Sequence, residues 1–147
     1  MRNNIKGFTL IEMLVVIAII AVLVSVIIPT VTSATDKAEA AADAANLRST
    51  LGALNAEILV NHELAEEFII AMEPSESQYK PGAELYVVYT VPGIIDVYYV
   101  DAEGYYGLDY LADIAANGST SIEPEAPDLG TGEIWYKVGA GLANPPA

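Results

Sequence analysis

The stretch from Phe8 to Ile28 reads FTLIEMLVVIAIIAVLVSVII, and it decides how the rest of the chain can be arranged. Within these 21 residues only Thr9, Glu12 and Ser25 are polar. A helix rises about 1.5 Å per residue, so the stretch would be roughly 31 Å long, close to the thickness of a bilayer's hydrocarbon core. The sequence therefore predicts a helix that can span a membrane.

Two cations precede this apolar stretch. Arg2 and Lys6 are the only charged residues before it, and cations ahead of an apolar span hold that end in the cytoplasm. The remainder of the chain is then expected outside the membrane. Three interpretations are open: a secretory signal peptide cut where small residues follow at 32–34, a plain single-pass anchor, or a span in which Glu12 has a specific role.

Glu12 favours the third interpretation. A carboxylate inside an apolar span costs a few kcal/mol on insertion scales, and neither a signal peptide nor a plain anchor makes use of it. A cut between Gly7 and Phe8 would supply a partner, because it frees the α-amine of Phe8 at the head of the helix. Glu12 of a neighbouring copy could neutralise that amine, so that both charges enter a low-dielectric environment as a pair. This pairing would also fix the axial register of packed helices.

The run Lys6-Gly7-Phe8-Thr9-Leu10-Ile11-Glu12, followed by the apolar stretch, resembles the class III signal of type IV pilins and pseudopilins over residues 2 to 29. In that family a membrane aspartyl peptidase cuts after the glycine and N-methylates the new first residue. The resemblance implies a cut after Gly7, methylation of Phe8 and a role for Glu12 in assembly. Pro29 matches a proline that bends or loosens the family's long helix.

A helical pattern continues beyond the apolar stretch. Residues 34 to 60 are rich in alanine, the best helix former. Apolar residues at spacings of 4, 3 and 4 form one stripe, which we interpret as core that packs on a sheet: Leu47, Leu51, Leu54 and Ile58. Small residues form a face upstream that suits close approach of neighbouring helices or a plain solvated surface: Ala34, Ala38, Ala41 and Ala45.

Pro29 removes one hydrogen bond from a helix and clashes with the preceding turn. We expect a kink there rather than an end, because the helical pattern continues. A helix from Phe8 to about Ile58 would be about 77 Å long. A domain of this size cannot cover that length, so the first half of the helix must protrude from it.

The remainder of the chain carries the signals of a small sheet. Two β-rich runs, residues 84–91 and 94–100, flank the turn pair Pro92-Gly93 and predict an antiparallel hairpin. The other segments are assigned as follows: a short helix at 63–72, a turn at 101–104, a strand or short helix at 105–114, a loop at 117–132, a strand at 133–138 and a frayed tail at 139–147.

Composition excludes several classes of function. Six Lys and Arg against 20 Asp and Glu give a formal charge of −14, which disfavours direct nucleic-acid binding because that requires clustered cations. Cysteine is absent, so disulfides, thiolate metal sites and cysteine nucleophiles are excluded. His62, the only histidine, argues against a His-based metal cage or a hydrolase triad. Because no disulfide is possible, the C-terminal segment of the chain must be held by strand pairing and by burial of Ile134, Trp135 or Tyr136.

Acidic residues are the other candidates for a site. Five of them fall within 18 positions: Asp96, Asp101, Glu103, Asp109 and Asp113. Calcium takes such oxygens, and the resemblance allows a calcium site, since some pseudopilins carry one. The spacing matches no EF-hand loop. We therefore interpret these acids as a solvated face and keep Asp96, Asp101 and Glu103 as candidate calcium ligands.

Three further features have ordinary interpretations beside functional ones. Most of the nine tyrosines suit strand packing, with adhesive contact as the alternative. His62 suits a solvated helix end. Asn117-Gly118-Ser119 fits the acceptor pattern for N-glycosylation and falls in the predicted loop.

Together these observations predict an α+β, pilin-like fold in which a long N-terminal helix, kinked near Pro29, packs on a small antiparallel sheet. Residues 1–7 would be a leader removed on maturation. Residues 8–60 would form the long helix, with 8–30 as membrane span and filament core and 31–60 packed on the sheet. Residues 61–147 would form a β-rich globular head.

The resemblance implies a structural protein without enzymatic activity or cofactor. It would be a type IV pilus subunit that starts in the cytoplasmic membrane and ends in an extracellular filament. Its partners would be further copies of itself, the prepilin peptidase and the pilus assembly machinery. A pseudopilin of a type II secretion or competence system is the alternative within the class. A membrane-anchored or secreted binding module is the alternative from another class.

Overall fold

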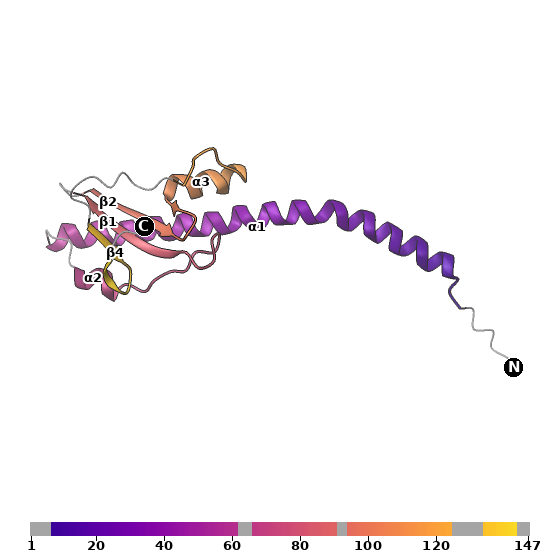
Figure 1. The fold of residues 1–147 in the computed structure, drawn as a ribbon, viewed down its shortest axis with the longest axis horizontal. Coiled ribbons are helices and arrows are strands. Elements are labelled where there is room, and N and C mark those ends of the chain that lie inside the picture. The colour runs from indigo at the N-terminus through magenta and orange to yellow at the C-terminus, as the bar shows by residue number, and fades with distance from the viewer. Residues whose placement is uncertain (1–6, 62–65, 91–93, 125–133, 144–147) are drawn as a thin grey trace. The chain divides into compact units, whose positions relative to one another are not determined.

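The computed structural model describes residues 7–61, 66–90, 94–124 and 134–143. Contacts along the chain divide it into two compact units, Met1–Thr35 and Asp36–Ala147. We call the second unit the head. Helix α1, Leu10–Asn61, supplies the described helical part of the first unit and continues into the head. The long N-terminal helix of the prediction is therefore confirmed, and it begins two residues later than expected (Figure 1).

The apolar part of α1 satisfies its own polar groups. The helix runs unbroken through Pro29. The hydroxyl of Ser25 donates to the carbonyl of Val22 at 2.7 Å, and Thr30 donates to Ile27 at the same distance. Thr32 and Thr35 likewise donate to carbonyls one turn earlier. Such back-bonding is what a hydroxyl needs where no water is present, so these residues do not prevent the helix from lying in lipid.

The head is built on a five-stranded antiparallel sheet with the order β3-β2-β1-β4-β5. Its strands are β1 Glu84–Thr90, β2 Ile94–Val100, β3 Tyr105–Tyr106, β4 Ile134–Lys137 and β5 Gly141–Ala143. Strands β1 and β2 pair over seven positions, from Glu84↔Val100 to Thr90↔Ile94. The predicted hairpin is therefore confirmed, while its turn at 91–93 lies outside the described residues.

Two short helices accompany the sheet. Helix α2, Glu66–Ala71, forms the described part of the helix predicted at 63–72. Helix α3, Leu108–Asn117, follows β3, so the ambiguous stretch 105–114 contains both a short strand and a helix. Gly118 ends α3 in the left-handed region, with φ 78°, and its N–H donates to the carbonyl of Ile114. Glycine adopts that conformation without steric cost.

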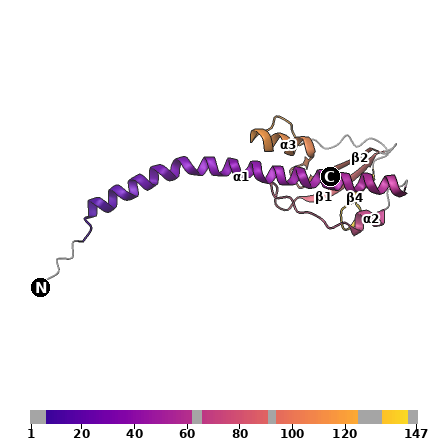
Figure 2. The same cartoon turned by 180° about the vertical axis from the view of Figure 1, so that it is seen from behind.

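The core lies between the head's half of α1 and one face of the sheet, as Figures 1 and 2 show from opposite sides. The predicted stripe is part of it: Leu47 and Leu54 are fully buried, and Leu51 and Ile58 pack against the same cluster. Alternation along the strands sends Val87, Val97 and Tyr99 to this face. The opposite face carries a smaller cluster of Val88, Val100 and Trp135.

The structure corrects the prediction for the C-terminal tail. Residues 139–147 were expected to fray, but β5 pairs with β4 from Lys137↔Gly141 to Trp135↔Ala143, while residues 144–147 lie outside the described residues. Gly139 and Gly141 have φ of 80° and 84°, which lets the chain reverse within three residues. The N–H of Gly139 also donates to the carbonyl of Ile69 in α2 at 3.2 Å. The pair of glycines two positions apart was the sequence signal for this turn.

Candidate processing and assembly site

The Gly7–Phe8 bond lies in chain that precedes the helix. Neither residue is helical, both are exposed, and 79% of the Phe8 surface is accessible. A peptidase binds its substrate as extended backbone, so a bond ahead of the first helical turn is more available for cleavage than one inside it. Lys6 and the rest of the leader lie outside the described residues.

Thr9 and Glu12 cap the start of α1 reciprocally. The carbonyl of Thr9 accepts the first helical hydrogen bond, from Met13 N at 3.3 Å. The Thr9 hydroxyl accepts Glu12 N–H at 3.3 Å, while Glu12 Oε2 accepts both the N–H and the hydroxyl of Thr9 at 2.8 Å. This is the capping-box arrangement, which satisfies two backbone donors that the helix leaves open. Glu12 therefore has a local role that the sequence analysis did not assign to it.

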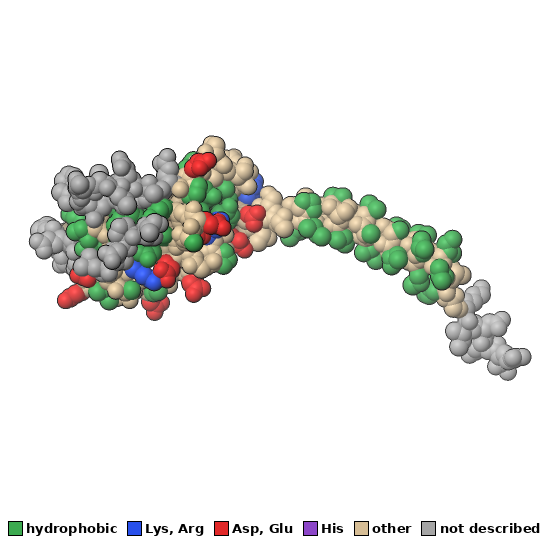
Figure 3. Space-filling view, viewed as in Figure 1, with side chains coloured by type: hydrophobic (Ala, Val, Ile, Leu, Met, Phe, Trp, Pro, Cys, Tyr) green, Lys and Arg blue, Asp and Glu red, His purple; other side chains and the backbone are tan. Residues whose placement is uncertain are grey.

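The segment that follows is an exposed apolar surface on every side. Seventeen large apolar side chains between Phe8 and Val31 are exposed, from 44% for Val24 to 83% for Leu10. Figure 3 shows them as an almost continuous run of green side chains. Hiding each from water stabilises by about 1.5–3 kcal/mol, so the sum exceeds the roughly 5–15 kcal/mol net stability of a domain. This segment must be covered by lipid or by protein.

Length and composition alone make α1 able to cross a membrane, and it is the one helix of the described residues that qualifies. Its apolar window is entirely unburied within the chain. A core helix of a water-soluble domain would be covered by its own chain. The segment is therefore consistent with a signal sequence, with a membrane span, or with a helix covered by similar helices in a polymer.

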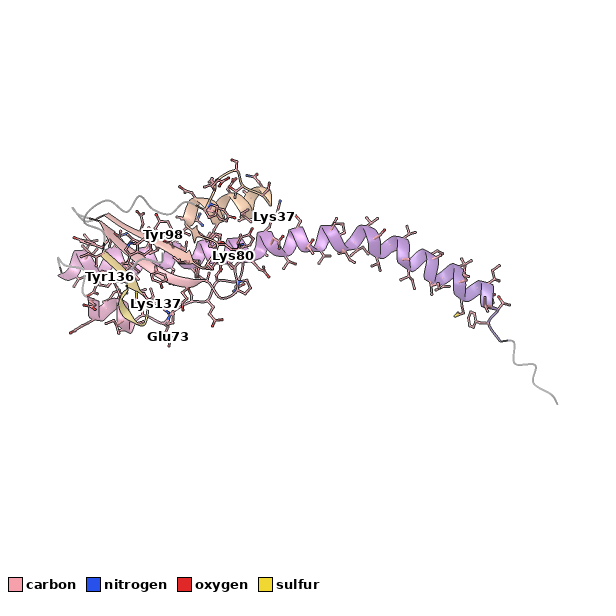
Figure 4. The ribbon with its side chains drawn as sticks, viewed as in Figure 1. Lys37, Glu73, Lys80, Tyr98, Tyr136 and Lys137 are labelled. Atoms are coloured by element: carbon pink, nitrogen blue, oxygen red, sulfur yellow. The ribbon has the colours of Figure 1, made fainter. Side chains whose placement is uncertain are left out.

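Two ion pairs lie on the described part of the head. Lys80 Nζ lies 2.8 Å from Glu103 Oε2 and 5.2 Å from the centre of the Tyr106 ring. The hydrogen bond from Lys80 to Glu103 raises the pKa of Lys80 above its usual range, against a smaller opposing effect of burial. Lys137 pairs with Glu84 at 2.6 Å. Figure 4 labels Lys80 and Lys137 on the loop before β1 and on β4.

Lys37 binds the end of a helix. Its Nζ donates to the carbonyl of Ala116, in the last turn of α3, at 3.3 Å. A cation at a helix C-terminus satisfies an open carbonyl and complements the helix dipole. Figure 4 shows Lys37 extending toward α3. The contact fixes α3 against α1 within the head.

The candidate calcium ligands are not brought together. Asp96 is exposed on β2, and Glu103 is held by Lys80. Asp101 Oδ1 accepts the N–H of Glu103 at 2.7 Å, the N–H of Gly104 at 3.1 Å and the hydroxyl of Tyr106 at 3.2 Å, which makes it the residue that shapes the predicted turn at 101–104. No group of three or more metal-binding side chains occurs in the part of the chain that the structure describes. The calcium hypothesis therefore gains no support.

Asp43 is a polar residue that the sequence analysis passed over. It is fully buried on α1, and Oδ2 accepts the hydroxyl of Ser77 at 2.5 Å and the N–H of Tyr79 at 3.1 Å. The N–H of Gln78 donates to Oδ1 at 2.9 Å. A buried carboxylate is tolerated only with such partners. Asp43 thus fastens the loop before β1 to the long helix, and a lone acid on an alanine-rich face was its only signal.

The remaining candidates have structural surroundings. At most 1% of the surface of Tyr99 and of Tyr106 is exposed, which confirms sheet packing for these two residues. Asn117 is exposed at the end of α3, and its amide donates to Asp113 at 2.5 Å. Hydrogen bonds from Thr120 and Asn117 lower the pKa of Asp113. His62 lies outside the described residues. Trp135 is buried as predicted, Tyr136 is half-buried, and Ile134 is 39% exposed.

Residues 2–28 match the family model described as the prokaryotic N-terminal methylation motif. No curated protein and no solved structure shows a significant match to the chain. The matched residues include Gly7, Phe8 and Glu12, and they end just before Pro29. The motif supports a precursor of the type IV pilin-like or pseudopilin class, which the prepilin peptidase processes and which assembles into pilus-type polymers.

Proposed function

We propose that this chain is a structural subunit of a type IV pilus. It enters the cytoplasmic membrane as a prepilin with the head outside, is cut after Gly7, is N-methylated at Phe8 and polymerises through its apolar helix into an extracellular filament. The observation that carries the proposal is the exposed apolar segment of α1, which follows directly on the Gly7–Phe8 bond and lies almost wholly within the matched motif. The filament would serve adhesion, motility or uptake.

Assembly exchanges one apolar environment for another. Lipid tails are as apolar as leucine, so the helices gain little hydrophobic free energy by leaving the membrane, and close packing must supply the preference. Glu12 sets the axial register between neighbouring helices. In the free subunit its carboxylate accepts the capping donors of Thr9. In the filament the same carboxylate also neutralises the methylated amine of Phe8 on a neighbouring copy, so that neither charge is buried alone.

Mass spectrometry of the mature N-terminus tests the processing step. N-methyl-Phe8 supports the proposal. A start after Ala34 points to an ordinary secreted protein, and an intact Met1 points to an uncut anchor. Either of these outcomes overturns the filament function and favours the alternative of a secreted or membrane-anchored binding module.

Substitution at Glu12 tests the assembly step. Glu12→Ala is expected to insert and to be processed but to yield few filaments. Glu12→Gln is the matched control, because it keeps an oxygen for the Thr9 cap and removes only the charge. If Glu12→Gln assembles normally, the charge pairing is wrong and capping alone explains the residue.

A pseudopilin of a type II secretion or competence system is the second candidate. The processing motif is shared by both, so it supports each equally. Filaments that extend beyond the cell surface at the native expression level favour the pilus. Filaments seen only on overproduction, together with loss of protein secretion or DNA uptake on deletion, favour the pseudopilin.

A further inference from the structure

Strand β2 has one edge that is only partly covered. Strand β1 pairs with all seven residues of β2, whereas β3 on the other side pairs only with Tyr99 and Val100. Within the part of the chain that the structure describes, the residues of β2 before Tyr99 therefore have no strand partner on the β3 side. We call this part the open edge of β2. Such an edge is a row of backbone donors and acceptors to which an extended chain can add.

The register of the hydrogen bonds identifies the groups at the open edge. The N–H of Asp101 donates to the carbonyl of Gly104 at 3.1 Å, in the turn that joins β2 to β3. Bonded positions alternate along an antiparallel pair, so Tyr99 directs its backbone groups toward β3. By the same alternation, the N–H and C=O groups of Val97 and Ile95 point to that side, where β3 no longer runs.

A cavity of about 320 Å³ lies along the open edge. Val97 and Tyr98 line it from β2, and its other walls include the start of α3 at 107–110, Leu51 of α1 and residues 122–123. Figure 4 labels Tyr98 on β2. The Tyr98 ring lies against Gly107, where an added Cβ would be 3.0 Å from its Cε1 atom. Because α3 starts so close to β2, a single extended chain fits beside the open edge better than the broad margin of a second sheet.

The cavity has an acidic rim. Asp96, Asp109 and Glu123 line it, and all three are exposed. None of its described lining residues is Lys or Arg, and neither ion pair of the described head involves these acids. Asp109 also lies in the first turn of α3, where it offsets the positive end of the helix dipole. The cavity therefore favours a cationic ligand and disfavours further copies of this chain, whose formal charge is −14.

Alternation along β2 sets the side chains that an added strand should carry. Val97 is buried in the core on the α1 side, while its neighbour Asp96 is exposed on the opposite face. A residue that pairs with Val97 would direct its side chain to the α1 side, where Leu51 lines the cavity. The residues before and after it would lie on the side of Asp96. An apolar side chain suits the first position, and Lys or Arg suits the two flanking positions.

We propose that the open edge of β2 binds an extended cationic peptide segment of a partner protein by strand addition. Its sequence alternates basic and apolar residues. Backbone hydrogen bonds to Ile95 and Val97 hold the strand, and the acids of the rim select the basic residues. The inference goes beyond the proposed function, because it concerns the head alone and applies equally to a pilus subunit and to a pseudopilin.

Fluorescence anisotropy of dye-labelled peptides tests the binding, with the full-length chain in a neutral detergent. The probe is Lys-Val-Lys-Val-Lys. The matched control is Lys-Pro-Lys-Pro-Lys, which has the same charge but lacks the N–H groups that would donate to the carbonyls of Ile95 and Val97. We expect the control to bind about tenfold more weakly, because it loses two backbone hydrogen bonds. Equal affinity of the two peptides, or no binding of the probe, overturns the proposal.

Amide hydrogen exchange locates the bound peptide. Exchange of the N–H groups of Ile95 and Val97 should slow when Lys-Val-Lys-Val-Lys is added, because these groups gain acceptors. The N–H groups of Asp96 and Tyr98 already face β1 and should change much less. Equal slowing at all four positions, or no slowing at Ile95 and Val97, contradicts addition at the open edge.

Charge reversal tests the role of the rim. Asp96→Lys and Glu123→Lys, on two different walls of the cavity, should each weaken binding of the probe about tenfold. Glu76→Lys is the matched control, because it changes the net charge equally at an exposed acid that does not line this cavity. Equal weakening in all three variants would mean that net charge alone attracts the peptide, which refutes the site. No step of these tests requires a polymer, so their failure leaves the filament function standing. Absence of N-methyl-Phe8 would refute the filament function and leave the peptide site standing.

Discussion

The carboxylate of Asp43 and the hydroxyl of Ser77 lie 2.5 Å apart inside the head, although 34 residues separate them in the sequence. The same carboxylate accepts the backbone N–H groups of Gln78 and Tyr79. The Ser77 hydroxyl in turn accepts the N–H of Lys80 at 2.9 Å. One acid on α1 thereby orders the loop that leads into β1, a strand at the centre of the sheet.

Asp43→Ala should destabilise the head by about 2–4 kcal/mol, because it leaves several buried donors without an acceptor. Urea unfolding of the full-length chain in detergent, followed by the fluorescence of Trp135, measures the change. Glu76→Ala is the matched control, since Glu76 is an exposed acid on the same loop. A similar loss in both variants would contradict the role assigned to the buried carboxylate.

Thr9→Ala should fray the first turn of α1 by removing both the hydroxyl acceptor of Glu12 N–H and one donor to the Glu12 carboxylate. Loss of an N-cap costs about 1 kcal/mol. Amide hydrogen exchange at Glu12 and Met13, whose N–H groups donate to Thr9, should then speed up by about fivefold in micelles. Thr9→Ser retains the hydroxyl and should restore slow exchange. Equal exchange in the alanine variant and the wild type would show that the cap does not persist when the helix lies in detergent.

Trp135 offers a test of packing on the outer face of the sheet. It is 2% exposed, with ring centroids 5.5 Å from Tyr105 and 6.0 Å from Tyr86. Its Nε1 has no hydrogen-bond partner among the residues that the structure describes. Trp135→Phe should therefore change stability much less than Trp135→Ala, for which about 3–5 kcal/mol is expected. Thermal unfolding followed by circular dichroism compares the two variants. An equal loss of stability in both would indicate that the indole N–H has a hydrogen-bond partner.

The head should lose stability at alkaline pH. Burial raises the pKa of Tyr99 and of Tyr106, and the hydrogen bond to Glu103 raises the pKa of Lys80. A raised pKa means that the folded state keeps a proton that the unfolded chain has released. Stability is therefore fully present below about pH 10 and falls as the pH rises further.

Ultraviolet absorbance of tyrosinate, recorded together with Trp135 fluorescence, checks this expectation. Some tyrosines should ionise only as the head unfolds. Tyr99→Phe removes one of them, together with the 2.7 Å contact to Ser75, and should reduce the late fraction of the absorbance change. Complete tyrosine ionisation near pH 10 in a head that is still folded would refute the prediction.

The sequence was sufficient where a pattern was long or local. The apolar run and the stripe from Leu47 to Ile58 predicted α1, because periodicity over many turns outweighs single residues. Pro92-Gly93 between two β-rich runs predicted the hairpin. The motif around Glu12 predicted a processing site, which stays a prediction. The contact of Glu12 with Thr9 was missed, although the spacing of three fits a capping box.

The sequence was insufficient where structure depends on distant partners. Asp43 was given no role from the sequence, since nothing local indicates the loop residues that surround it. Strand β5 is only three residues long and owes its existence to pairing with β4 and to the turn at Gly139 and Gly141. The acids from Asp96 to Asp113 are close in sequence but are distributed over a strand, a turn and a helix. Proximity along the chain therefore said little about proximity in space.

The two outermost strands of the sheet, β3 and β5, have two and three residues. Backbone groups left open at a sheet margin invite another sheet to add on, and the hazard grows when many copies are held at high local concentration. Such abbreviated margins give a neighbouring molecule almost no length on which to register. Addition of another sheet at β3 or β5 would therefore gain only two or three residues of pairing, which disfavours fusion of crowded copies through these two strands.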